Sequence, residues 1–181
     1  MVSEGLVKYN IKNSPISSFI ALSLVVIYLL FNMNILSQIP CGTNINNVFM
    51  SNFTHIDLSH LMSNLYALYA ISRVEKQMGF KSFFWLLVFL LIFNTLVTWL
   101  ARVYIKNWKC SIGFSGILFG LLTWEISSQK SVDINIIISI VIMVVTPSLN
   151  STNISLIGHT LGAISGVIGG LLWKYLVNKN S

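Results

Sequence analysis

The chain has 181 residues, of which 55% are hydrophobic and only 9% are charged. A typical soluble domain carries about 25% charged residues, so this composition excludes a soluble globular domain and indicates a membrane protein. The net charge of +6 does not indicate nucleic-acid binding, because no basic cluster is denser than the stretch from Lys106 to Lys109.

Six apolar segments follow one another and predict an all-α polytopic membrane protein with six transmembrane helices. In chain order they are Ser18–Leu36, His60–Gly79, Ser82–Tyr104, Ser115–Ser127, Ile134–Thr146 and Ile157–Val177. The expected organisation is an N-terminal segment (residues 1–17), one six-helix domain (18–177) and a short tail (178–181). No cleavable signal peptide is expected, because the first apolar run lacks a small-residue cleavage site.

The segment that begins at Ser115 is too short to cross a membrane. Its length of about 13 residues gives about 20 Å of helix, against an apolar core of about 30 Å. Such a helix must extend into its flanks or begin below the membrane surface. In the second case Ser115 would lie roughly 10 Å deep, in a water-filled pocket.

The distribution of Lys and Arg favours an orientation in which both chain ends are cytosolic. Eight basic residues fall on the expected inner side and three on the outer side. The inner ones are Lys8, Lys12, Arg73, Lys76, Lys81, Lys130, Lys174 and Lys179, and the outer ones are Arg102, Lys106 and Lys109. The connection from Ser37 to Ser59 carries no Lys or Arg, as expected of an outer loop.

Three histidines and five acidic residues leave few catalytic mechanisms. Metal-dependent hydrolysis needs at least three ligands, usually with a His-Glu-x-x-His pair in zinc proteases; that motif is missing, so neither metal nor cofactor is expected. An aspartyl pair is not expected, because Asp57 and Asp133 lie on opposite predicted sides. Nothing marks Cys110 as a nucleophile. Ser115 and His159 remain as nucleophile and base.

Glycines surround both candidates. Gly113 permits a tight entry into the helix that begins at Ser115, and that helix start directs free N–H groups toward the place where an oxyanion would form. Two pairs of glycines four residues apart form small faces that let helices pack closely: Gly116 with Gly120, and Gly162 with Gly166. Their packing would bring the two candidates within reach. The alternative is plain helix packing that tolerates a Ser and a His.

His60 and Asn64 are one turn apart, so both would face the same way and donate hydrogen bonds to an oxyanion. The alternative is an interfacial His with an Asn bonded to a neighbouring helix. His55 and Asp57 are expected to make structural hydrogen bonds, and Glu125 to be solvated or paired with a basic residue.

The predicted outer loops carry further features. Cys41 and Cys110 are expected as two unpaired thiols, with a disulfide as the alternative. The polar loop Pro147–Leu156 is expected to be mobile and to cap the site. Glycosylation sequons begin at three asparagines, which are Asn52, Asn150 and Asn153.

Four motifs together resemble the rhomboid intramembrane serine proteases over nearly the whole chain. They are His55…His60-x-x-x-Asn64, Glu75-x-x-x-Gly79, Gly113-Phe114-Ser115-Gly116 and His159-x-x-Gly162-x-x-x-Gly166. The resemblance implies the rhomboid fold and a serine endopeptidase with a Ser115–His159 dyad. It further implies oxyanion support from His60 and Asn64, and Phe119 packed on the histidine.

The pattern Phe53-x-His55-x-Asp57 looks most like the endoplasmic reticulum rhomboids of eukaryotes, and the first outer loop lacks the Trp-Arg pair common in bacterial members. The resemblance implies substrates with a transmembrane helix, a lipid bilayer around the protein, and an endoplasmic reticulum or other endomembrane location rather than the plasma membrane. Two other functions stay open: a non-catalytic derlin-like factor that binds transmembrane clients, and a small transporter that relays protons through His159.

Overall fold

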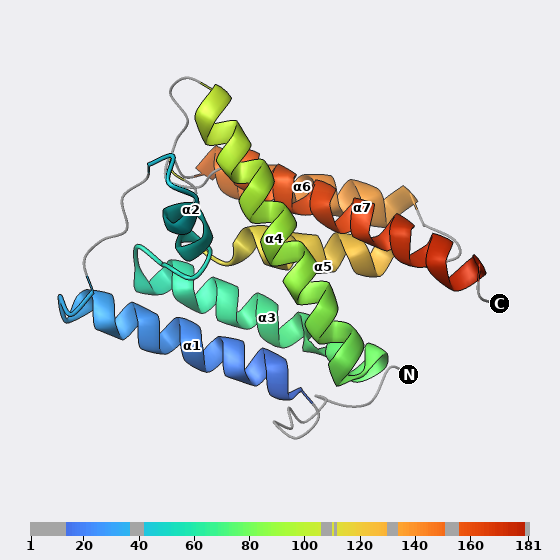
Figure 1. The fold of residues 1–181 in the computed structure, drawn as a ribbon, viewed down its shortest axis with the longest axis horizontal. Coiled ribbons are helices and arrows are strands. Elements are labelled where there is room, and N and C mark those ends of the chain that lie inside the picture. The colour runs from blue at the N-terminus through green and yellow to red at the C-terminus, as the bar shows by residue number, and fades with distance from the viewer. Residues whose placement is uncertain are drawn as a thin grey trace.

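The computed structural model describes residues 14–36, 42–105, 110, 112–129, 134–150 and 156–179. Within these ranges the regular elements are seven helices, shown in Figure 1. They are α1 (Pro15–Asn32), α2 (Ile45–Ser51), α3 (Leu58–Met78), α4 (Phe80–Tyr104), α5 (Ser115–Ser127), α6 (Ile134–Asn150) and α7 (Leu156–Lys179). The all-α prediction is confirmed. Each of the six apolar segments predicted from the sequence overlaps one helix, and α2 is the helix that has no counterpart among them.

Three helices are long and apolar enough to cross a membrane, namely α1, α4 and the part of α7 from Leu156 to Tyr175. The helices α5 and α6 contain shorter apolar stretches, and the 21-residue α3 is more polar. These apolar helices fit an integral membrane protein. Of the six predicted spans, three meet this test of length and hydropathy within the described ranges.

A buried carboxylate joins α1 to α3 at one end of the bundle. Glu75 of α3 accepts hydrogen bonds from the backbone N–H groups of Ile16 (2.8 Å) and Ser17 (2.9 Å). It also accepts one from the Ser17 hydroxyl (2.7 Å). An acidic group at a helix N-terminus satisfies free N–H groups and complements the helix dipole. Gly79, with φ +81°, then ends α3 and leads directly into α4.

The helices α5 and α7 form the most extensive helix pair of the fold. A Cβ atom on Gly162 would collide with the backbone of Gly116, and one on Gly166 would collide with the backbone of Gly120. The two glycine faces therefore pack against each other, as the sequence predicts. In addition, the Thr123 hydroxyl donates across the interface to a backbone carbonyl of α7 (2.8 Å).

Two features of the predicted outer loops differ from the prediction. The α2 helix was not predicted; its N-cap Asn44 accepts a hydrogen bond from the backbone N–H of Asn46 (2.9 Å), and its buried side chains pack toward α4. The expected start of a loop at Pro147 is wrong, because α6 continues to Asn150. Membrane helices tolerate proline. Residues 151–155 of that predicted loop lie outside the described ranges.

Candidate active site

The structure brings Ser115 and His159 into contact. Ser115 is the first residue of α5 and His159 lies in the first turn of α7. The distance from Ser115 Oγ to His159 Nε2 is 2.9 Å, which is a hydrogen bond. His159 is only 7% exposed, and Ser115 is half-buried. A neutral imidazole with its proton on Nδ1 would accept the serine proton at Nε2.

Gly113 shapes the entry into α5. Its φ of +114° lies in the region that favours glycine. A Cβ atom there would stand 2.6 Å from Cε1 of His60, so the missing side chain also makes room for that ring. The Gly113 N–H donates to the Ser51 carbonyl at the end of α2 (2.9 Å). The turn before Ser115 is thus held by α2 and lies directly on His60.

Phe119 and His159 form a ring pair with centroids 4.7 Å apart and planes tilted by 42°. This contact lies one helical turn after Ser115, as the sequence predicts for an aromatic residue at this position. On its other side the ring approaches the backbone of Val144 in α6, although Nδ1 makes no hydrogen bond of ordinary geometry with the described residues. The hydrogen bond and the ring contact together fix the imidazole orientation.

His60 and Asn64, both on α3, lie beside the Ser115–His159 pair. Both line the same cavity as Ser115 and His159. The Asn64 amide donates a hydrogen bond to the His60 carbonyl (2.8 Å). This bond uses one of the two N–H groups of the amide. Asn64 is 3% exposed, and its Oδ1 has no hydrogen-bond partner among the described residues.

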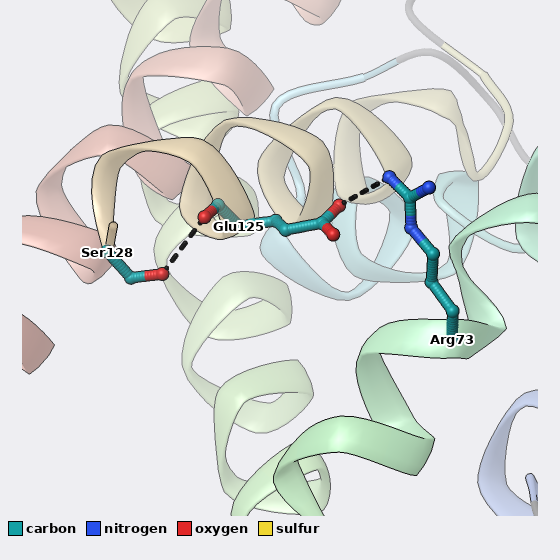
Figure 2. Close-up of polar contacts among 3 residues, drawn as sticks. All are labelled: Arg73, Glu125 and Ser128. Carbon is teal, nitrogen blue, oxygen red and sulfur yellow. Dashed lines mark hydrogen bonds and ion pairs between the residues drawn. The ribbon is translucent and has the colours of Figure 1, made fainter. Parts of the chain in front are cut away.

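The cavity has a volume of about 410 Å³ and runs between α3 and α5. Its polar end holds Ser115 and His159, and its middle is lined by apolar side chains such as Ala67 and Leu118. Arg73 lines the far end, where its Nη2 lies 3.1 Å from Oε2 of Glu125 on α5 (Figure 2). The expectation that Glu125 pairs with a basic residue is confirmed. This pair ties α3 to α5 at the end of the cavity opposite to Ser115.

His55 and Asp57 precede α3 and differ in role. Asp57 caps the helix, because its carboxylate accepts from the backbone N–H of His60 (2.7 Å) and from the Ser59 hydroxyl (2.6 Å). Those hydrogen bonds lower the pKa of Asp57. The His55 ring approaches the backbone of Phe53, although neither ring nitrogen makes a hydrogen bond of ordinary geometry with the described residues. The ring also packs on the His60 ring, with centroids 5.0 Å apart. Burial, and to a smaller extent His60, lowers the pKa of His55 to about 4.

A buried polar network next to the site was not predicted. Asn94 of α4 donates to Oδ1 of Asn52 (3.0 Å), and Asn52 donates to the Thr95 hydroxyl (3.3 Å). Asn94 also packs on the start of α5, since a Cβ atom on Gly116 would lie 3.1 Å from its Nδ2. Polar residues at positions 94, 98 and 102, each four apart, share one face of an otherwise apolar helix. That stripe was the signal in the sequence for this network.

Three expectations for the loops are corrected or limited. The Asn52 sequon does not lie on an open loop, because Asn52 is 6% exposed and its amide donates to carbonyls of α2.

Cys110 is disulfide-bonded, so the expectation of two unpaired thiols is wrong. Arg102 donates to the carbonyl of Gly42 (3.4 Å), which joins the segment after Cys41 to the end of α4. The sequence could not indicate this proximity. Cys41 itself and the sequon asparagine at 153 lie outside the described ranges, as does the side chain of the one at 150.

Within the described ranges, no three His, Cys, Asp or Glu side chains come together as a metal site would require.

The family model of the rhomboid domain matches residues 42–176, which include α2 to α6 and most of α7. A protein of Acanthamoeba polyphaga mimivirus, named as a rhomboid protein, is 27% identical over 128 residues, which are 70% of this chain and 74% of that protein. The chain belongs to the rhomboid family.

Proposed function

We propose that the protein is an intramembrane serine endopeptidase that cleaves membrane proteins with a transmembrane helix. The observation that carries this proposal is the 2.9 Å hydrogen bond between Ser115 Oγ and His159 Nε2 at the end of a cavity. Ser115 would attack the scissile carbonyl while His159 takes its proton. His159 would then return the proton to the leaving amine, and water would hydrolyse the acyl-enzyme. The proposed catalytic unit is a dyad of Ser115 and His159, without an acidic residue as a third member.

The proposed oxyanion site lies where the α5 helix begins. The backbone N–H groups of the first turn have no acceptor inside the helix, and they point out of its N-terminus. The His60 ring and the second N–H of Asn64 supply further donors from α3. Donors arranged in advance around the developing negative charge are commonly the largest contribution to acyl-transfer catalysis.

The cavity suits an apolar polypeptide segment. Its middle part, between the dyad and Arg73, is lined mainly by apolar side chains of α3 and α5. A substrate helix must unwind near the dyad, because the carbonyls of an intact helix are already hydrogen-bonded. The substrate would therefore present a short extended stretch to Ser115 while its apolar remainder contacts the cavity wall.

We further propose that the Ser115 end of the bundle faces the lumenal side of an endomembrane. Arg102, which counted against this orientation, is buried and donates to the Ser51 hydroxyl (3.2 Å). Its charge therefore has a structural role and says little about topology. A cysteine introduced at exposed Asn46 should react with an impermeant thiol reagent only from the lumenal side. One at exposed Gln129 should react only from the cytosolic side, and the opposite pattern would contradict the orientation.

Cleavage of a transmembrane reporter by the purified protein in lipid nanodiscs tests the function. The unchanged protein should cut the reporter, and Ser115→Ala should not. Ser23→Ala is the matched control, because this half-buried serine of α1 donates to a carbonyl of its own helix and, among the described residues, lines neither cavity. Reporter binding without cleavage by the unchanged protein would instead support a derlin-like, non-catalytic factor.

A further inference from the structure

A second cavity, of about 390 Å³, lies between the first turns of α4 and the last turns of α7. Its polar lining consists of Lys81, Ser82, Trp85 and Trp173. The cavity lies far from the dyad, because the Trp173 ring packs on Trp124 near the last turn of α5 (centroids 6.0 Å apart), whereas Ser115 begins that helix. It therefore belongs to the opposite end of the bundle.

The missing side chain of a glycine lets α7 approach α4 closely at this place. A Cβ atom on Gly169 would stand 2.9 Å from the Phe89 ring. The ring and the neighbouring side chains of Leu86 and Leu172 form an apolar wall that leads away from the polar lining. A ligand in this cavity would thus meet polar groups at one end and hydrocarbon at the other.

The polar end presents hydrogen-bond donors and a positive charge. Lys81 is exposed and forms no ion pair with any described residue. Ser82 adds a hydroxyl, and the two indoles, 67% (Trp85) and 40% (Trp173) exposed, carry N–H groups that can only donate. None of the described residues that line the cavity is acidic. This set is complementary to a phosphodiester, which offers only acceptors and a negative charge.

We propose that this cavity binds one anionic glycerophospholipid. Its phosphate would contact Lys81 and Ser82, its glycerol esters would accept from the indole N–H groups, and one acyl chain would lie along Phe89 and Leu172. The charge of Lys81 favours an anionic headgroup over a zwitterionic one, because a zwitterion brings its own cation to the same place. The proposal is independent of whether the dyad is catalytic.

Native mass spectrometry of the full-length protein in detergent tests this site. The protein is titrated with phosphatidylglycerol and, separately, with phosphatidylcholine of the same acyl chains. One phosphatidylglycerol should bind saturably and more tightly than phosphatidylcholine. A Lys near an anionic lipid is worth about 1 kcal/mol, so Lys81→Gln should weaken phosphatidylglycerol binding about fivefold. Lys76→Gln is the matched control, because Lys76 lies in the last turn of α3 and does not line the cavity.

A second variant tests the apolar part of the site. Leu172→Trp should fill the cavity and abolish saturable binding of both lipids, while Trp85→Phe keeps the ring, loses its N–H and should weaken both moderately. A melting temperature measured for each variant confirms that it is folded. The proposal is overturned if Lys81→Gln and Lys76→Gln bind phosphatidylglycerol alike, or if the folded Leu172→Trp protein binds it as the unchanged protein does.

Discussion

Gly162 lies directly on the backbone of Gly116, so α7 touches α5 with no side chain between them. Gly116 follows Ser115, and Gly162 lies less than one turn after His159. The position of the nucleophile relative to the proposed base is therefore set by backbone contact between two rigid helices. Such contact tolerates little change in distance, which suits a site whose geometry must hold without a third residue.

The first prediction concerns the next glycine contact of the same interface, between Gly166 and Gly120. Gly166→Ala should destabilise the protein by about 1–3 kcal/mol, because the added methyl group meets the backbone of Gly120 and the Thr123 hydroxyl rather than a movable side-chain end. Reduced reporter cleavage should accompany the loss. Thermal unfolding in detergent measures the first effect. Gly42→Ala is the control, since no described residue lies within 4 Å of the added atom; equal melting temperatures for both variants would contradict the packing argument.

Asn64→Ala should lower turnover by about 10²–10³-fold while leaving substrate affinity nearly unchanged, because an oxyanion donor acts mainly in the transition state. Initial rates of reporter cleavage over a range of substrate concentrations separate kcat from KM. Ser63→Ala serves for comparison, because this neighbour also lines the cavity. Its hydroxyl donates its single proton to the His60 carbonyl, so it has no second N–H or O–H to offer an oxyanion. A full-rate Asn64→Ala enzyme would demote Asn64 to helix packing.

The sequence predicted the positions of the helices and the start of α5 at Ser115 well, because both depend on local patterns. Apolar length fixes where a membrane helix lies, and glycines four apart mark a helix face wherever that helix goes. Gly113 likewise indicates that a helix begins at Ser115. These features need no knowledge of which distant segments meet.

The parts that the sequence could not predict depend on long-range contacts. Asn52 was expected in an outer loop, and its burial could not be predicted because it depends on a contact with Asn94, 42 residues away. Arg102 was counted as an outer surface charge, although α2 covers it. The packing of His55 on His60 was not predicted, because it follows only from the way in which the loop folds over α3.

The buried Asn52 predicts that this sequon carries no glycan in the folded protein. A glycosyltransferase cannot reach an amide that already donates to carbonyls of α2 and to Thr95. Asn52→Gln should leave the electrophoretic mobility of the expressed protein unchanged, yet lower its melting temperature because these hydrogen bonds are lost. Asn46→Gln, at an exposed position of α2, should change neither. A mobility shift in the Asn52→Gln protein would disprove the burial.

Stability should depend on pH through His55. The pKa of this residue is lowered from 6.5 to about 4 in the folded protein, so between these values the unfolded chain binds the proton and the folded protein does not. The free energy of unfolding is therefore highest above pH 6.5, and it should fall by up to about 3 kcal/mol as the pH drops toward 4. Melting temperatures measured across this window should decline less steeply for His55→Phe. Parallel curves for the two proteins would exclude His55 as the cause.

The reactivity of Ser115 toward a fluorophosphonate tests the central claim most directly, because this probe phosphonylates a serine only when a neighbouring base activates it. Intact-mass and peptide analysis of the solubilised protein should find one adduct, located on Ser115. Ser115→Ala and His159→Ala should each abolish it, whereas the control Ser23→Ala should not. Labelling of His159→Ala at the full rate, or no adduct on the unchanged and folded protein, would contradict the Ser115–His159 dyad.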